Sequence, residues 1–312
     1  MKLLLVTMLM VCWLGAGWAQ TRPAQPARPL EDDPQARIIL DVTRVNLLFT
    51  VTDKRGRFVT DLTKDDFTVR EGKTFQKILE FTAESDLPLR LAILVDSSNS
   101  IRDRFRFIQE AAIEFLTSVM RPQQDKSAVI SFDTAPELQA DLSSDIEAQA
   151  RVIRQLRAGG GTSLYDAIFY ASRDKLMLDQ PRHKFRRAMV ILSDGDDNQS
   201  RYTRDQALEM AQKADVVIYT ISTNITRIES DGDKVLKYLS SETGGVTFFP
   251  FKVEDLSQSF ENIANEMRHQ YNVLYRPEPM KTDGSFQAVE LRVKTRGNLV
   301  VRSRRGYYAP KL

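Results

Sequence analysis

The sequence of 312 residues has very few of the side chains that bind transition metals: it contains one cysteine, Cys12, and two histidines, His183 and His269. A structural zinc site takes about four cysteine or histidine ligands, and a disulfide takes two cysteines. Both are therefore excluded, as is any other site that needs several imidazole or thiolate ligands.

An excess of charge and the common catalytic motifs are also missing. Lysine and arginine number 44 and aspartate and glutamate number 42, which leaves a net charge of +2 and no strong field to hold a nucleic acid. Three glycines precede Thr162, but the lysine of a phosphate-binding loop is absent, and neither Gly-x-Ser-x-Gly nor His-Glu-x-x-His occurs. We therefore expect no nucleic-acid partner and no nucleotide hydrolysis.

Long apolar runs are scarce, and the main one lies at the start of the chain. A lysine at position 2 precedes an apolar run over 3–14 that is short for a membrane span, and small residues end at Ala19. This pattern predicts a signal peptide over 1–19, a secreted or periplasmic (cell-envelope) protein, and no transmembrane segment after cleavage. A lipoprotein signal is disfavoured because Val11, which is not small, precedes Cys12. Residues 20–36 hold four prolines and no apolar period, which is typical of a flexible linker.

The two flanking segments of the folded part, 37–86 and 271–312, have strand patterns. Apolar and mostly polar residues alternate over 45–51 and again over 289–293, and turn residues separate such runs. Isolated hairpins are marginal in water. We therefore expect both segments to fold together as one small β-sandwich-like domain.

The segment 87–270 has a different pattern, in which short apolar runs rich in β-branched residues alternate with amphipathic stretches. Such runs are typical of parallel strands that are buried on both faces, and amphipathic stretches predict helices. Ser144 with Glu147 and Thr203 with Gln206 predict capping-box helix starts, and one helical stripe is formed by Phe105, Ile108, Ala112, Phe115 and Val119. The runs are 91–95, 128–132, 188–192, 216–221 and 246–249. We predict an α/β fold, a doubly wound and mostly parallel sheet, inserted into the β-sandwich-like domain.

Oxygen-bearing side chains follow the predicted strands. Asp96, Ser98 and Ser100 come directly after the first run, Thr162 follows the glycine loop, and Asp194 comes directly after the run over 188–192. Ligands of doubly wound sheets bind at the carboxyl ends of the strands. Two carboxylates and three hydroxyls at that edge would form an all-oxygen site that suits Mg²⁺ and leaves room for water.

Each piece of this pattern has a simpler interpretation when it is taken alone. A single aspartate or serine after a strand is usually a helix N-cap. The acidic stretch 194–198 resembles a calcium loop, but it lacks the spacing of an EF-hand to a terminal glutamate, so a solvated turn is favoured. For the basic clusters at 182–187 and 302–305 we favour solvated faces over phosphate binding.

The order of these residues resembles the von Willebrand factor A (VWFA) domain family, whose metal-ion-dependent adhesion site (MIDAS) has the pattern Asp-x-Ser-x-Ser, Thr, Asp. All five positions are matched here, and further similarity lies in the stretches 161–164 and 191–195, at Leu239 and in 243–245. The resemblance covers about 87–270. With its signal peptide and flanking β segments, the whole chain is similar to the bacterial secreted VWFA-related proteins of acidobacterial type.

The resemblance implies a Rossmann-like sheet with a MIDAS at its edge. Ser98, Ser100 and often Thr162 would contact the metal, while Asp96 and Asp194 would act mainly through water. A Glu or Asp carboxylate of a protein partner would take the open position. Mg²⁺ or Mn²⁺ is the expected ion, with Ca²⁺ less favoured.

We therefore expect a non-enzymatic, adhesion-type binding module. Two alternatives stay open: a metal-dependent hydrolase or phosphoryl-transfer enzyme that uses Asp96 and Asp194, and a structural envelope protein with a vestigial site. Catalysis is disfavoured because neither histidine lies near the motif in the sequence to act as a general base.

Overall fold

The computed structural model describes residues 44–83, 87–179, 184–224, 226, 228–250, 253–294 and 297–311, without the side chains of 253–257. These residues all belong to one structural unit, Leu40–Leu312. The predicted signal peptide over 1–19 and the linker over 20–36 lie outside the described residues. Within the described ranges, a helix long and apolar enough to cross a membrane does not occur.

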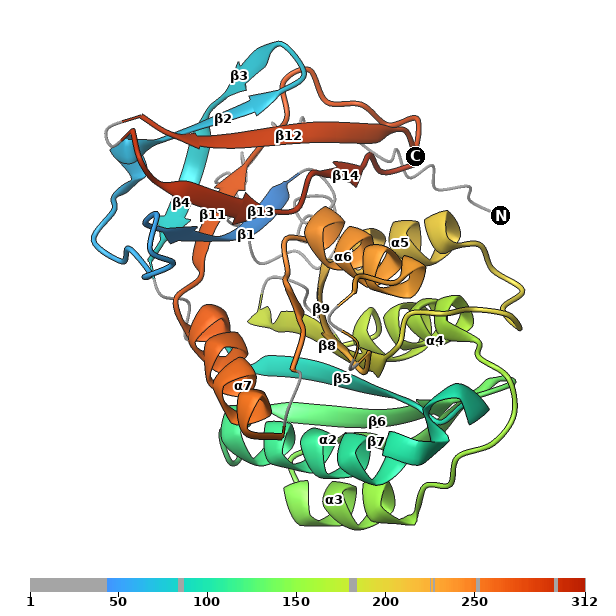
Figure 1. Cartoon of the computed structure of the whole chain (residues 1–312). Coiled ribbons are helices and arrows are strands. Elements are labelled where there is room, and N and C mark those ends of the chain that lie inside the picture. Colours follow the sequence, from blue (N-terminus) through green and yellow to red (C-terminus); the bar gives the residue numbers. More distant parts are fainter. Residues whose placement is uncertain are drawn as a thin grey trace, which may run out of the picture. The chain divides into compact units, whose positions relative to one another are not determined.

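The middle of the chain forms a six-stranded sheet with the strand order β10-β9-β8-β5-β6-β7 (Figure 1). Five strands are parallel, and β7 is antiparallel to its neighbour β6. The strands are β5 (Leu89–Asp96), β6 (Lys126–Phe132), β7 (Pro136–Ser143), β8 (Arg186–Ser193), β9 (Val216–Ser222) and β10 (Thr247–Phe248). Every residue of β5, β8 and β9 is buried, which confirms the mostly parallel sheet predicted from the apolar runs.

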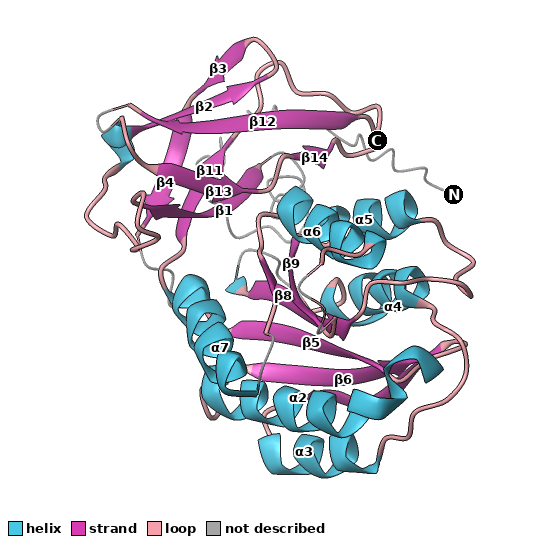
Figure 2. Ribbon diagram, viewed as in Figure 1, coloured by secondary structure: helices cyan, strands magenta, loops and turns pink. Residues whose placement is uncertain are grey.

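Helices cover both faces of this sheet (Figure 2). Alternate residues of β5 point to opposite faces of the sheet. On one face, Leu91, Ile93 and Val95 share a hydrophobic core with α2, α3 and α7. On the other face, Ala92 and Leu94 share a second core with α4, α5 and α6. The helices are α2 (Phe105–Val119), α3 (Ile146–Gln155), α4 (Leu164–Tyr170) with a π-helical continuation η4 (Ala171–Leu176), α5 (Arg204–Lys213), α6 (Asp231–Thr243) and α7 (Val253–Arg268), with a 3-10 helix η3 (Asn99–Arg104) before α2. The doubly wound α/β class is therefore confirmed.

Local signals place some helix starts correctly and others not. The capping box of Thr203 and Gln206 at the start of α5 is present as predicted. The capping box expected from Ser144 and Glu147 is wrong, because α3 is capped by Asp145, whose side chain accepts a hydrogen bond from the Ala148 amide at 2.9 Å. Asp145 is one residue nearer the helix, where its carboxylate reaches the free amides of the first turn.

The flanking segments form two four-stranded antiparallel sheets, with the orders β13-β1-β11-β4 and β14-β12-β2-β3. The strands are β1 (Val45–Thr52), β2 (Phe67–Glu71), β3 (Thr74–Gln76), β4 (Ile78–Thr82), β11 (Tyr271–Tyr275), β12 (Phe286–Val293), β13 (Val300–Ser303) and β14 (Gly306–Tyr308), with a 3-10 helix η2 (Lys64–Asp66) before β2. Each sheet combines strands from both ends of the folded chain, since β1 pairs with β11 and β13, and β2 with β12. The limits 37–86, 87–270 and 271–312 themselves stay predictions.

An aromatic cluster fills the core between these two sheets. Phe49 stacks on Tyr271 at 5.4 Å between ring centroids and meets Phe67 edge to face at 5.1 Å. The carboxylate of Glu71 accepts hydrogen bonds from the hydroxyls of Tyr275, at 3.1 Å, and Tyr307, at 3.2 Å. Because Tyr275 of β11 belongs to one sheet, and Glu71 of β2 and Tyr307 of β14 belong to the other, the bond from Tyr275 ties the two sheets together.

The basic segment, which we define as Arg302, Ser303, Arg304 and Arg305, joins the two domains. Arg302 approaches Glu266 of α7 at 3.4 Å, Arg304 pairs with Asp215 beyond the end of α5, and Arg305 pairs with Glu242 of α6 at 3.1 Å. The interpretation of this cluster as a solvated face is wrong for Arg304, whose side chain is only 10% exposed. Cations near helix C-termini interact favourably with the helix dipole.

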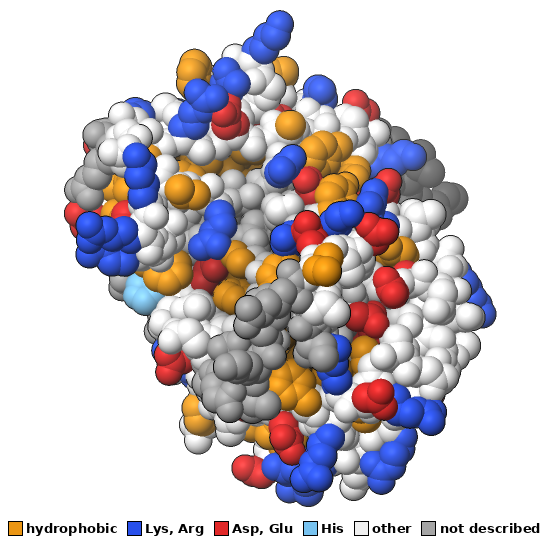
Figure 3. Space-filling model, viewed as in Figure 1, with side chains coloured by type: hydrophobic (Ala, Val, Ile, Leu, Met, Phe, Trp, Pro, Cys, Tyr) orange, Lys and Arg blue, Asp and Glu red, His pale blue; other side chains and the backbone are white. Residues whose placement is uncertain are grey.

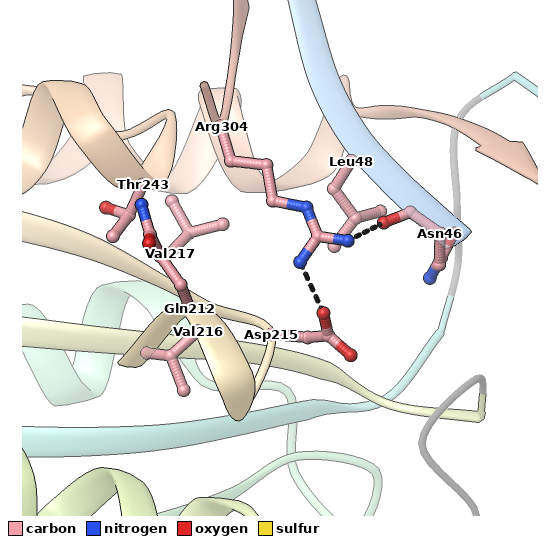
Figure 4. Close-up of a pocket in the computed structure, with 8 residues that line it drawn as sticks. All are labelled: Asn46, Leu48, Gln212, Asp215, Val216, Val217, Thr243 and Arg304. Carbon is pink, nitrogen blue, oxygen red and sulfur yellow. Dashed lines mark hydrogen bonds and ion pairs between the residues drawn. The ribbon is translucent and has the colours of Figure 1, made fainter. Parts of the chain in front are cut away.

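A cavity of ≈ 20 Å³ lies beside Arg304 at this junction (Figure 4). Asn46 and Leu48 of β1 line one side of it, and Gln212, Thr243 and neighbouring residues of the α/β domain line the other. A guanidinium nitrogen of Arg304 also donates to the backbone oxygen of Asn46 at 2.7 Å. One arginine thus contacts both domains.

In the other basic cluster the prediction of a solvated face is wrong for Arg186 and Arg187, whereas Lys184 is exposed. Arg186 and Arg187 at the start of β8 are 5% and 2% exposed. Arg186 donates to the Leu87 carbonyl at 3.0 Å and Arg187 to the Leu176 carbonyl at 2.7 Å. On the face drawn in Figure 3, side chains of Lys and Arg are interspersed with those of Asp and Glu.

Deleting residues 271–312 should cause aggregation. The deletion removes β11 and β13, the two strands that pair with β1, and exposes apolar side chains such as Leu47 and Phe49 that are now 0% and 1% exposed. Size-exclusion chromatography and circular dichroism test this. A monomeric truncated protein with unchanged β content would show that the two segments do not depend on one another.

Glu266 should make the protein less stable as the pH rises. Its side chain is 3% exposed, and burial raises its pKa to about 7 although Arg302 and the Thr50 hydroxyl, at 3.5 Å, favour the charged form. The folded protein thus keeps this proton to higher pH than the unfolded chain, whose glutamate has a pKa of 4.5. The free energy of unfolding should fall between these two pKa values.

Glu266→Gln should remove this decrease in the free energy of unfolding. The decrease is on the order of 3 kcal/mol, at about 1.4 kcal/mol per unit of pKa difference. Urea unfolding at a series of pH values from 4 to 8 measures it. Glu261→Gln, on the exposed face of the same helix, is the matched control and should leave the pH profile unchanged. Identical profiles for wild type and Glu266→Gln would contradict the assignment.

Candidate functional site

Asp96 is the last residue of β5, at the carboxyl edge of the parallel sheet, and it is fully buried. One carboxylate oxygen, Oδ1, accepts a hydrogen bond from the backbone amide of Ser98 at 2.9 Å. The other, Oδ2, accepts a hydrogen bond from the hydroxyl of Ser193 at 2.6 Å. Both oxygens are therefore held in place by neighbouring groups.

The surroundings of Asp96 disfavour its charge. Burial raises the pKa of the carboxyl to about 6, and the nearby charge of Asp194 raises it further, while the hydrogen bonds from Ser193 and Ser98 oppose the shift. A buried carboxylate with a raised pKa and a second carboxylate nearby is typical of a site that gains from a bound cation.

Ser98 and Ser100 bring their hydroxyl oxygens together, with a separation of 2.9 Å. Ser98 is buried at the start of η3, whereas Ser100, within the same 3-10 helix, is exposed. Two neighbouring ligands of an octahedral Mg²⁺ with bonds of about 2.0–2.1 Å lie about 2.9 Å apart. The two hydroxyls thus have the spacing that one hard cation requires of adjacent ligands.

Thr162 lies in the glycine loop before α4 and is 2% exposed. Its amide donates to the side-chain oxygen of Asn198 at 2.9 Å, and its carbonyl accepts from the amides of Asn198 and Gln199 at 3.0 Å. The Thr162 hydroxyl takes no part in these three bonds. The backbone alone therefore fixes the residue.

The glycine loop is also bonded to the loop that follows Asp96. The Gly159 amide donates to the Ser97 carbonyl at 2.7 Å, and the Asn99 amide donates to the Gly160 carbonyl at 3.3 Å. Because Thr162 is bonded on its other side to the segment after Asp194, the three loops that carry the predicted residues form one connected rim. The structure thus brings all five predicted residues to the same edge of the sheet.

Asp194 follows β8 directly and is partly exposed. Its Oδ1 accepts a hydrogen bond from the Asp196 amide at 3.2 Å. The next residue, Gly195, has φ +85°, and a Cβ there would lie 2.2 Å from the carbonyl oxygen of Gly232. A glycine is therefore required for the turn to pass α6 and present Asp194 at the rim.

The donor set fits a hard divalent cation. It consists of carboxylate and hydroxyl oxygens, which suit Mg²⁺ or Mn²⁺. The hydroxyl of Ser163, next to Thr162, is a further buried oxygen for which no hydrogen-bond partner is found among the described residues. Clusters of three or more His, Cys, Asp or Glu side chains arranged to bind a metal do not occur in the described ranges, and a site built on hydroxyls does not need one.

The sequence did not indicate several residues that shape this rim. The stretch 194–198, interpreted as a solvated turn, holds the start of α4: Asp197 accepts from the Tyr165 amide at 3.0 Å, and Asn198 holds Thr162. The bond from Ser193 to Asp96 was not foreseen either. The serine directly before Asp194 was the only hint of this bond in the sequence. Its partner Asp96 lies 97 residues away and can be identified only when the pairing of β5 with β8 is known.

Comparison with known proteins identifies the class of this fold. Residues 91–266 match the von Willebrand factor type A domain. The match covers more than half of the chain, which belongs to this family. Domains of the family typically use a MIDAS for metal-dependent protein binding and are generally interaction modules rather than enzymes.

Solved structures with a similar fold are only distantly related in sequence. Proximal thread matrix protein 1 from the mussel byssus, solved with a zinc-occupied MIDAS motif, is 16% identical with a TM-score of 0.50; the match covers 64% of this chain and 50% of that one. A von Willebrand factor type A protein from Catenulispora acidiphila is 12% identical with a TM-score of 0.49, over 86% of this chain and 74% of that one.

BatB from Bacteroides thetaiotaomicron is 15% identical with a TM-score of 0.46, and the match covers 57% of this chain and 98% of that one. At these identities the similarity concerns the fold alone. A search of curated proteins found no match.

Replacing Asp96 by asparagine should flatten the pH dependence of stability in the absence of divalent cations. The pKa of Asp96 is raised from 3.8 to about 6 in the folded protein, so the free energy of unfolding should fall as the pH rises between these values. The loss is on the order of 3 kcal/mol at about 1.4 kcal/mol per pKa unit. Thermal unfolding in EDTA at pH 4–7 measures it. An unchanged profile in Asp96→Asn would show that the buried carboxyl of Asp96 is not the cause of the pH dependence.

Proposed function

We propose that this protein is a non-enzymatic binding module that holds a divalent cation at the rim and through it binds an acidic side chain of a protein partner. Ser98, Ser100 and Thr162 would contact the cation, and Asp96 and Asp194 would act mainly through water. The observation that carries the proposal is the pair of serine hydroxyls 2.9 Å apart next to the buried carboxylate of Asp96.

The bonds of the rim support this division of roles. Both oxygens of Asp96 already accept hydrogen bonds from the chain, so its charge acts at a distance. The hydroxyls of Ser98, which is buried, and Ser100, which is exposed, are bonded to one another. When bound, the cation supplies a positive charge that neutral hydroxyl ligands leave largely uncompensated and that attracts an outside Glu or Asp. Hydroxyl ligands also bind weakly by themselves, so partner and cation should strengthen each other's binding.

The all-oxygen donors favour Mg²⁺ or Mn²⁺, with Ca²⁺ less favoured because it takes more ligands. The zinc reported for the MIDAS of the mussel protein makes Zn²⁺ a useful further ion to test.

The described residues support binding over hydrolysis. Of the two histidines, His183 lies outside the described residues. The ring of His269 stacks on Phe58 of the β domain at 5.2 Å and follows α7, away from the carboxyl edge that carries Asp96. A histidine is the commonest general base, and this one does not belong to the rim. We favour a working site over a vestigial one because all five positions of the pattern keep oxygen-bearing side chains.

We also propose that the protein is exported, either secreted or retained in the periplasm or cell envelope. The charge at Lys2, the apolar run over 3–14 and the small residue Ala19 support this. On the same grounds we place the chain among the bacterial secreted VWFA-related proteins.

Calorimetric titration with Mg²⁺ should show binding to the wild-type protein and none to Asp96→Ala or Asp194→Ala. Loss of either carboxylate removes negative charge that stabilises the cation, while the fold should persist because both residues lie at the rim. Asp231→Ala is the matched control: Asp231 adds charge to the same face but pairs with Lys234 at the surface, so this variant should bind normally.

A pull-down from native extract, repeated with EDTA, then tests the partner. A partner retained equally in EDTA, or by Asp96→Ala, would refute the metal bridge and leave a plain protein interface.

A further inference from the structure

Ser193 occupies a special position as the last residue of β8, between the two carboxylates of the rim. It is fully buried. Its hydroxyl donates to Oδ2 of Asp96 at 2.6 Å and accepts from the amide of Gly195 at 3.0 Å. One small side chain is thus bonded both to the aspartate that ends β5 and to the turn that carries Asp194.

The hydrogen bond from the Gly195 amide to the Ser193 hydroxyl fixes the direction of the bond between Ser193 and Asp96. Because the Gly195 amide can only donate, it occupies a lone pair of the Ser193 oxygen, and the hydroxyl proton is left to point at Asp96. Hydrogen bonds from a hydroxyl to a carboxylate at about 2.5–2.7 Å are among the strong ones. In the fully buried setting of Ser193, water cannot replace the bond.

We propose that Ser193 is a positioning residue of the metal site, which orients the Asp96 carboxylate and the Asp194–Gly195 turn together before a cation binds. The inference rests on the proposed function, since it requires a cation at the rim. Groups that orient metal ligands in this way typically contribute about 10–100-fold to metal affinity.

The chain contains a close copy of this arrangement one strand away. Ser222 ends β9 and is the register partner of Ser193. Its hydroxyl donates to a buried aspartate, Asp233, at 2.6 Å and accepts from the amide two residues later, that of Asn224, at 3.1 Å. Asp233 belongs to the capping box of α6 and is not one of the proposed metal-site residues. Ser222 is therefore a matched control for Ser193.

The test is calorimetric Mg²⁺ titration of wild type, Ser193→Ala, Ser193→Thr and Ser222→Ala, with thermal unfolding in EDTA for each. Ser193→Ala should bind Mg²⁺ about 10–100-fold more weakly than wild type. Ser222→Ala loses an equivalent buried bond and should be destabilised to a similar degree, yet should bind Mg²⁺ like wild type. Ser193→Thr keeps the hydroxyl and should bind more tightly than Ser193→Ala.

Equal Mg²⁺ affinity of Ser193→Ala and wild type would overturn the inference. An equal loss of Mg²⁺ affinity in Ser193→Ala and Ser222→Ala would also overturn it, because the loss would then come from a general destabilisation of the sheet edge. A wild-type protein that binds no Mg²⁺ would instead overturn the proposed function, and the inference with it.

Discussion

The parallel strands β5, β8 and β9 are buried on both faces, and this constraint determines where chemistry can occur in the molecule. Polar side chains inside such a sheet would lose their hydrogen bonds to water, so they gather where the strands end. Asp96, Ser193 and Ser222 each occupy the last position of a strand and are each bonded to another group at the edge. The rim exists because the apolar interior leaves no other place for these groups.

The β domain depends on a different kind of interaction. Its two sheets are held together by the aromatic cluster around Tyr271 and by the hydrogen bond from Tyr275 to Glu71. The basic segment then attaches it to α6, to α7 and to the turn that follows α5 in the α/β domain. The side chain of Arg304 is 10% exposed, so loss of its partner Asp215 would leave a buried charge without its ion pair. Glu266, by contrast, is a buried acid whose proton is held nearly to neutral pH.

The sequence predicted best those elements that are determined by residues close together in the chain. Apolar β-branched runs located β5, β8 and β9, and the stripe of Phe105, Ile108 and Phe115 located α2. β7 was not predicted, because none of its residues is buried and no apolar pattern marks it. The ion pairs of the basic segment were misjudged, since they depend on residues far away in the sequence, 89 positions in the case of Arg304 and Asp215. For the site, the residue types and their order were sufficient to name five members, but not the hydrogen bond from Ser193.

The pairing of Thr82 with Asn272 in β4 and β11 has a consequence for the order in which the molecule forms. The first four strands of the β domain are synthesised long before the strands that complete their sheets, whereas the α/β domain lies between them as one continuous piece. Contacts that distant in sequence are slow to form because closing a long loop costs entropy. Once the α/β domain has folded, its two ends emerge side by side and that loop is already closed. The β domain should therefore fold last, using its neighbour as a template that brings β4 and β11 within reach of each other.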